Sequence, residues 1–306
     1  MDQVSAELAA AGHRRCVRKG RTAELTFRAR RQCTAARAIL DHQQRTLPMG
    51  RDEQTVEPPS LALLAAEGRG FLDIPALIAV AAPLLATAPR GQRHPVMVLP
   101  GLGADDRSTL AIRSFLEFLG YQVHGWGRGR NVRAPDADLA AVVARVLELE
   151  KQGGSKVSLV GWSRGGIIAR EVARQIPAAV RMVITLGSPF AAPGASNVRA
   201  IWRLLTGQKY QPPTAERISR LAQPIPVPST SIYTRTDGVV AWRACLEQEG
   251  GERENVEVNT THLGLGFHAP ALWVIADRLA QPAGTWKPFR APPQVGIWFP
   301  TATRRD

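Results

Sequence analysis

Residues 156–170 combine a short β-branched run, a glycine-flanked serine and a helical pattern. Ser163 stands inside the pentapeptide GWSRG at 161–165, between a buried-strand run and apolar residues at helical spacing. A serine hydroxyl is a weak nucleophile, so it must be presented where a base can take its proton. A sharp strand-to-helix turn does this by straining the serine backbone, and glycines leave room for the turn to close. We therefore predict that Ser163 is a catalytic nucleophile; the alternative is a tight turn that happens to contain a serine.

An acid and a base follow the serine in the order that this type of turn requires. Asp237 comes after the β-branched run 229–233, and His262 comes 25 residues later, beyond the run 256–258. In this arrangement the chain order is serine, acid, histidine. We predict that Asp237 orients His262 and that His262 is the general base. Asp237 could instead be a plain Asp-Gly turn residue, and His268 is the competing base, although the proline after it predicts a place at the start of the closing helix.

Two backbone amides are candidates for an oxyanion hole. One belongs to Arg164, the residue after the nucleophile, and the other to Leu102 in the glycine-containing loop LPGLG at 99–103. This loop does not fit a dinucleotide-binding fingerprint, because Asp106 occupies the third glycine position. We expect the GSP run at 187–189 to shape the floor of the pocket without a catalytic step.

The segment 191–228 interrupts the alternation of strands and helices and carries several aromatic and apolar residues. Loops at the carboxyl ends of parallel strands commonly hold functional groups. The segment is therefore either a lid-like insertion that forms a substrate wall or a packed connector. Trp162 and Trp202 are candidate substrate-binding residues, and Leu204, Leu205 and Tyr210 could also line an acyl site.

Apolar strands separated by amphipathic helices predict an α/β fold with a mostly parallel sheet that helices cover on both faces. We expect helical structure over 60–89, 109–119, 138–150 and 270–279 and a helix after the Ser163 turn that includes 167–173, and strands over 94–99, 121–124, 157–160, 182–186, 229–233 and 256–258.

The chain has 306 residues and a formal net charge of +13. Residues 1–50 hold ten Arg and Lys but four Asp and Glu, so much of this charge lies in one terminal arm. No basic pattern interleaved with aromatic residues occurs, which argues against nucleic-acid binding. We divide the chain into a basic, weakly structured arm (1–57), one domain (58–290) and a C-terminal tail (291–306). Met49 is a possible alternative start, and a chain beginning there is expected to fold and act like the full chain.

Cysteine usage and apolar runs give expectations about location. Three cysteines without a ligand or disulfide framework are typical of a reducing compartment, so we expect a cytoplasmic protein, with peripheral membrane association or export as alternatives. The uncharged run 74–88 resembles a signal-peptide core but contains two prolines and is short for a membrane span. We interpret it as an apolar helix packed on the domain, and we expect no stable membrane span. The oligomeric state is not indicated.

Taken together, these motifs resemble a bacterial α/β-hydrolase of the esterase/lipase type over about residues 60–290. The resemblance rests on PGLG at 100–103, GWSRG at 161–165, LGSPF at 186–190, DG at 237–238 and THLG at 261–264. It implies hydrolysis of a small-molecule or lipid-like carboxylic ester through an acyl-enzyme, with neither cofactor nor metal. Pro100 departs from the histidine that many lipases have before the oxyanion glycine. Acyltransferases, thioesterases, amidases and non-catalytic binding proteins share the fold.

Overall fold

The computed structural model describes residues 56–133, 135–207 and 209–300. Nearly all of the predicted basic arm, including Met49, lies outside the described residues, as do residues 301–306. The description below concerns the unit that begins at Thr55.

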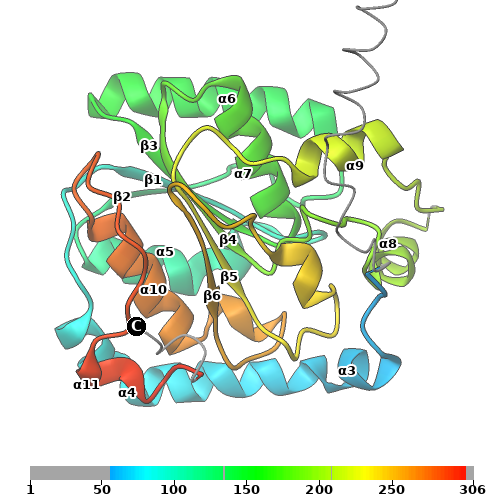
Figure 1. Ribbon diagram of the computed structural model, residues 1–306, viewed down its shortest axis with the longest axis horizontal. Coiled ribbons are helices and arrows are strands. Elements are labelled where there is room, and N and C mark those ends of the chain that lie inside the picture. Colours follow the sequence, from blue (N-terminus) through cyan, green and yellow to red (C-terminus); the bar gives the residue numbers. More distant parts are fainter. Residues whose placement is uncertain (1–55, 134, 208, 301–306) are drawn as a thin grey trace, which may run out of the picture. The chain divides into compact units, whose positions relative to one another are not determined.

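Six parallel strands form one sheet in the order β2-β1-β3-β4-β5-β6, which confirms the predicted parallel sheet (Figure 1). The strands are β1 (Pro95–Leu99), β2 (Gln122–Gly125), β3 (Val157–Trp162), β4 (Val180–Leu186), β5 (Ser229–Tyr233) and β6 (Arg253–Glu257). Every adjacent pair is parallel.

Helices cover both faces of this sheet (Figure 1). The longer ones are α4 (Asp73–Thr87), α5 (Leu110–Phe118), α6 (Pro135–Gly153), α7 (Arg164–Gln175), α8 (Val198–Thr206), α9 (Ala215–Ala222) and α10 (Ala269–Ala280). Short helical segments are α3 (Leu61–Ala65), η1 (Ala66–Leu72), η2 (Asp106–Thr109), η3 (Trp242–Cys245), η4 (Gly264–Gly266) and α11 (Pro293–Gly296). One core contains side chains of α4, α5 and α10, and the other contains side chains of α6 and α7.

The central strands supply side chains to both cores. All five residues of β1 are buried. Val96 and Val98 belong to the core beneath α5 and α10, whereas Met97 and Leu99 belong to the core beneath α6 and α7. Successive side chains of a strand point to opposite faces, so a sheet covered on both sides requires an uninterrupted apolar run. This explains why β1 reads as a continuous apolar segment.

The direction of strand addition reverses between β1 and β3. From β1 the chain moves outward to β2 and then returns past β1 to β3, after which each new strand is added on the far side. The loops that leave the carboxyl ends of β1 and β3 therefore diverge. Such a reversal leaves a crevice at the carboxyl edge, which is where ligands bind in open α/β sheets.

Three segments differ from the sequence-based expectations. Strand β6 begins at Arg253, before the apolar residues that predicted a strand at 256–258, because its polar residues pair in register with β5. The insertion 191–228, for which no helix was predicted, contains α8 and α9. In the predicted tail, Val295 and Phe299 are buried in the main core, so this segment packs as part of the domain.

The run Leu61–Thr87, comprising α3, η1 and α4, is apolar on its inner and outer sides. Leu84 is buried, and Leu77, Val80 and Leu85 pack against the main core, as the interpretation of a packed apolar helix requires. The outer side remains open: Ile78 is 72% exposed. Among the described residues this run has the length and composition of a membrane-crossing helix, with a mean hydropathy of 1.8.

Candidate active site

Ser163 occupies the turn between β3 and α7 in a strained conformation. Its φ of 53° and ψ of −120° lie in a region that side-chain-bearing residues rarely adopt. The Ser163 N–H donates to the Leu186 carbonyl at 2.7 Å, which ties the turn to the end of β4. Strain of this kind persists only where the surroundings impose it, and it is concentrated at functional sites.

Glycines allow α7 to approach the sheet closely at this turn. A side-chain carbon added at Gly161 would lie 2.3 Å from the Cα atom of Gly166, and one added at Gly165 would lie 2.3 Å from the Leu99 carbonyl oxygen. Backbone atoms occupy both positions, so neither contact could be relieved by a side-chain movement. The spacing of the glycines around Ser163 is therefore a packing requirement of the turn itself.

Asp237 and His262 form a buried pair at the carboxyl edge of the sheet. The two atoms His262 Nδ1 and Asp237 Oδ2 are 2.6 Å apart, and the residues are 4% and 3% exposed. The other oxygen, Asp237 Oδ1, accepts the N–H groups of Val239 and Val240 at 2.9 and 2.7 Å. Asp237 is thus held by its own loop, and its free oxygen is aimed at the imidazole.

Two opposing effects set the pKa of His262. Burial lowers this pKa, because it disfavours the charged imidazolium. The charge and hydrogen bond of Asp237, together with the charge of Glu67, outweigh burial and raise the pKa above its usual value of 6.5. With Nδ1 donating to Asp237, the neutral ring presents Nε2 as its acceptor.

The serine, the histidine and the loop after β1 line one cavity. Ser163, His262, Gly101 and Leu102 all contribute to its wall. Ser163 makes no direct hydrogen bond to His262 within the described part of the chain, and catalytic contacts of this kind commonly tighten only when substrate binds. A side-chain carbon at Gly101 would lie 3.4 Å from the Ser163 Cβ atom, so the β1 loop passes directly beside the nucleophile.

Asn131 holds this β1 loop and was not identified from the sequence. Its side-chain amide donates to the Pro100 carbonyl at 2.8 Å, its carbonyl accepts from Gly103 at 2.9 Å, and its N–H donates to Ala104 at 2.8 Å. The side chain is fully buried. A single asparagine in an arginine-rich loop carries no recognisable sequence signal. The Gly103 N–H is thus bonded to Asn131, whereas the neighbouring Leu102 lines the cavity.

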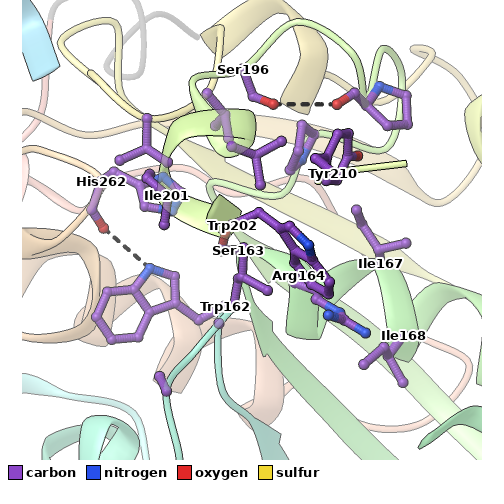
Figure 2. A pocket seen from close by; sticks show the side chains of 18 of the residues that line it. Trp162, Ser163, Arg164, Ile167, Ile168, Ser196, Ile201, Trp202, Tyr210 and His262 are labelled. Carbon is purple, nitrogen blue, oxygen red and sulfur yellow. Dashed lines mark hydrogen bonds between the residues drawn. The ribbon is translucent and has the colours of Figure 1, made fainter. Parts of the chain in front are cut away.

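The cavity has a volume of about 950 Å³, and its walls come from distant parts of the chain (Figure 2). The insertion 191–228 contributes many of the lining residues, among them Ser196, Val198, Ile201, Trp202, Tyr210, Pro212 and Leu221. The chain from α8 to α9 therefore forms one wall of the cavity. The side chain of Leu204 is outside the described ones, and Leu205 packs against Gly103 instead.

The two candidate substrate-binding tryptophans have different surroundings. The Trp162 indole N–H donates to the His262 carbonyl at 3.1 Å and its ring packs edge-on against Phe267, so it supports the histidine loop as well as lining the cavity. The Arg164 guanidinium carbon lies 5.9 Å from the centroid of the Trp202 ring, and this ring contacts Tyr210 edge-on (Figure 2).

His268 lies away from this group of side chains. It precedes α10, as predicted from the proline after it, and it is not among the cavity-lining residues. Burial lowers its pKa to about 4 despite the opposing charge of Asp73. Within the described ranges, no cluster of three or more His, Cys, Asp or Glu has the arrangement of a metal site.

The family model of the α/β hydrolase fold matches residues 82–217, which is less than half of the chain. This stretch includes β1, β3, the Ser163 turn and β4, and the parallel sheet continues in the same manner beyond it. The chain has an α/β-hydrolase fold. The predicted fold class is thereby confirmed, with an entirely parallel sheet.

Several solved structures resemble this chain in fold at low sequence identity. Lipase B of Aspergillus fumigatus is 18% identical, with 65% of this chain and 57% of that chain covered and a TM-score of 0.49. Lipase BlEst2 of Bacillus licheniformis is 17% identical, with 64% and 95% covered and the same TM-score of 0.49. A monoacylglycerol lipase of Paleococcus ferrophilus is 15% identical, with 62% and 96% covered and a TM-score of 0.44. By sequence, no curated protein matches.

Proposed function

We propose that this α/β hydrolase cleaves carboxylic esters with Ser163 as nucleophile, His262 as general base and Asp237 as the residue that orients His262. The hydrogen bond of 2.6 Å between His262 Nδ1 and Asp237 Oδ2, beside the cavity that Ser163 also lines, is the main support for this proposal. A carboxylate, an imidazole and a strained serine in this chain order are the groups that acyl transfer through serine requires.

The acylation step uses the proton acceptor that Asp237 leaves free on His262. Ser163 Oγ forms a bond to the ester carbonyl carbon while its proton passes to His262 Nε2. The carbonyl oxygen becomes an oxyanion, and the amides of Leu102 and Arg164 donate to it. Arg164 begins α7, where the N–H groups have no acceptor within the helix. The bond to the leaving alcohol then breaks, and His262 returns the proton to the alcohol oxygen.

Deacylation repeats this sequence with water as the nucleophile. His262 takes a proton from water, the resulting oxygen attacks the acyl-enzyme carbonyl, and the same two amides donate hydrogen bonds to the oxyanion that forms. Ser163 leaves as the alcohol when His262 donates the proton back. Acid and alcohol are the products, and neither a cofactor nor a metal enters the balance.

The lining of the cavity supports an apolar acyl group as substrate. Ile167, Ile201, Trp202 and Leu221 contribute apolar surface, and water-excluding apolar walls favour apolar ligands. We therefore propose small-molecule or lipid-like esters, with short-to-medium apolar acyl chains preferred over charged ones.

Two measurements test this function. A fluorophosphonate probe should label the wild-type chain and should fail to label Ser163→Ala, because the probe reacts with an activated serine. A panel of p-nitrophenyl esters from acetate to palmitate should then show turnover with a maximum at one acyl length. Absence of both labelling and turnover would favour a non-catalytic binding protein.

Product analysis separates hydrolysis from acyl transfer. When an alcohol is added to the ester assay, a hydrolase releases mainly the free acid, and an acyltransferase forms mainly the new ester. A predominance of new ester would replace hydrolysis by acyl transfer while leaving the roles of Ser163, Asp237 and His262 unchanged.

A further inference from the structure

A buried glutamate from the N-terminal helical segment reaches the two loops that carry Asp237 and His262. Glu67 belongs to η1 and is 4% exposed. Its Oε1 atom accepts the N–H of Gly238 at 2.6 Å and the N–H of His262 at 3.1 Å. Its Oε2 atom accepts the N–H of Leu263 at 2.9 Å. The Glu67 carboxylate therefore hydrogen-bonds both to Gly238, which follows Asp237, and to His262.

The backbone around Glu67 is pressed against both loops. A side-chain carbon at Gly238 would lie 2.3 Å from the Leu63 carbonyl oxygen, and one at Gly70 would lie 2.3 Å from Thr261 Oγ1. The segment on either side of Glu67 thus packs on the acid loop through Gly238 and on the base loop through Gly70. Close packing of this kind leaves little freedom for either loop to shift relative to the other.

We propose that Glu67 is a positioning residue that fixes the separation of the acid-bearing and base-bearing loops, so that His262 is held against Asp237 and faces the cavity. This inference rests on the proposed function for its catalytic consequence. The contacts themselves do not depend on it, because Glu67 binds three backbone N–H groups whatever reaction the cavity performs. Glu67 lines no part of the cavity and would not touch substrate.

Glu67 also acts on the imidazole through its charge. The charged groups that raise the pKa of His262 are Asp237, from the loop after β5, and Glu67, from η1; burial works against them. Neighbouring Ser163, Trp162 and Gly187 bring no ionic charge. Removing the charge of Glu67 should therefore lower the pKa of His262, so that the base becomes neutral at lower pH.

Three substitutions at Glu67 separate its charge from its reach. Glu67→Gln keeps an oxygen for Gly238 and His262 but loses the charge and turns an NH2 group toward the Leu263 N–H. Glu67→Asp keeps the charge and shortens the side chain. Glu67→Ala removes both the charge and all three acceptors, and buried amides without a partner destabilise their loops.

Steady-state kinetics across pH should distinguish these variants. In Glu67→Ala we expect kcat to fall by about 10- to 100-fold with little change in KM, because misplacement of a catalytic group affects the chemical step. In Glu67→Gln we expect a smaller fall in kcat and an acidic limb of kcat/KM that moves to lower pH. In Glu67→Asp the acidic limb should stay close to that of the wild type while kcat falls.

Glu254→Gln is the matched control. Glu254 is another buried glutamate that accepts a backbone N–H, from Phe289, but it stands in β6 at the opposite end of the strand from the acid and base loops. Its substitution should lower the melting temperature without moving the pH profile. If Glu254→Gln reduced kcat and shifted the profile as the Glu67 variants do, the effect of Glu67 would be general destabilisation and the proposal would be wrong.

NMR titration of His262 keeps this test independent of ester turnover. The Nδ1 proton and the pKa of the ring report the Asp237 contact directly, and Ser163→Ala provides the assignment background with no chemistry. We expect the pKa of His262 to be lower in the double variant Ser163→Ala/Glu67→Gln than in Ser163→Ala alone. An unchanged pKa with unchanged kinetics would overturn the proposal. If the wild type turned over no ester but the pKa still moved, the proposed function would fail and the positioning role would stand.

Discussion

The two ends of β3 carry the same two residue types in different settings. Ser158, the second residue of the strand, forms a hydrogen bond of 2.9 Å with His94 Nε2. Ser163 follows the last residue of the strand and lies in the cavity that His262 also lines. By distance alone the first pair is the better serine–histidine contact. Its surroundings show why proximity is not sufficient for reactivity.

The histidines differ in what faces their second nitrogen. His262 Nδ1 has Asp237 at 2.6 Å, and this carboxylate contributes to a raised pKa. No carboxylate among the described residues bonds to His94 Nδ1, and burial, assisted by the charge of Arg181, outweighs the backbone at Gln92 and lowers the pKa of His94 to about 4. An imidazole that cannot hold a proton above this pH is a poor general base near neutrality.

The serines differ in backbone and access. Ser158 is fully buried within a strand paired on both sides, so no substrate carbonyl can reach its hydroxyl. Ser163 is strained and stands where β3 ends and α7 begins. Strain, an orienting carboxylate and an open cavity therefore distinguish the candidate nucleophile from a structural serine–histidine pair.

The largest expected effect comes from exchanging each serine for alanine. Ser163→Ala should reduce ester turnover by more than about 10⁴-fold, because the nucleophile itself is lost, and should leave the melting temperature nearly unchanged. Ser158→Ala should keep most of the turnover and lower the stability by about 1–3 kcal/mol, since it leaves His94 without its partner. Steady-state assays and urea unfolding of both variants measure the difference. Retention of a tenth of the activity in Ser163→Ala would remove this serine from the mechanism.

A second comparison concerns the histidines. His262→Ala should lose activity about as completely as Ser163→Ala, because members of one catalytic unit are not additive. His94→Ala and His268→Ala should retain much of theirs, as neither lines the cavity. Parallel turnover assays decide this. The reverse result for His268 would transfer the role of base to it.

His262 and His94 should also make opposite contributions to the pH dependence of stability. Because the pKa of His262 is raised, kcat/KM should fall on the acid side with an apparent pKa above 6.5. Any stability that the protonated His262 gains from Asp237 is present below the unfolded pKa of 6.5 and is lost as pH rises through the folded pKa. Because the pKa of His94 drops from 6.5 to about 4, this group should cost about 3 kcal/mol of stability as pH falls across that window.

His94→Gln tests the stability part of this prediction. Glutamine can still bond to Ser158 but does not titrate, so urea unfolding of the variant should depend less steeply on pH between 6.5 and 4 than that of the wild type. Equal slopes would show that His94 is not buried in its neutral form.

The smallest expected effect is on acyl-length preference and concerns the cavity that Ser163, but not Ser158, lines. Trp202→Ala should change the acyl-length preference by a few-fold with little effect on stability, because the ring lines the cavity and is only partly buried. The ester panel measures the shift. An unchanged profile would indicate that the segment 191–228 is a packed connector.

Sequence reasoning performed best where the signal was local. The Ser163 turn lies within a few residues of a strand, a helix and its own glycines, so its pattern survives without knowledge of the fold. Strand β5 was predicted with the observed bounds for the same reason. Asp237 and His262 were predicted from their order after Ser163 and their places beyond two expected strands, and the parallel sheet brings the ends of β5 and β6 to one edge.

Residues that act through long-range contacts gave no such signal. Glu67 and Asn131 look like ordinary polar residues in their own segments, and each acquires a role from loops that are remote in sequence. The start of β6 was missed because its pairing with β5 compensates for polar residues. Phe299 enters the core from a segment whose local sequence resembles a tail.

The contacts of Glu67 also determine when the catalytic edge can be completed during biosynthesis. Glu67 precedes Gly238 by 171 residues and His262 by 195. Its partners are therefore synthesised long after it, and contacts of such separation close late in folding because the intervening chain must first be ordered. The Ser163 turn can form as soon as β3, α7 and β4 are available. Under the proposed function, a nascent or partly unfolded chain holds its nucleophile before it can align a base, so ester turnover would itself report that the whole domain has been assembled.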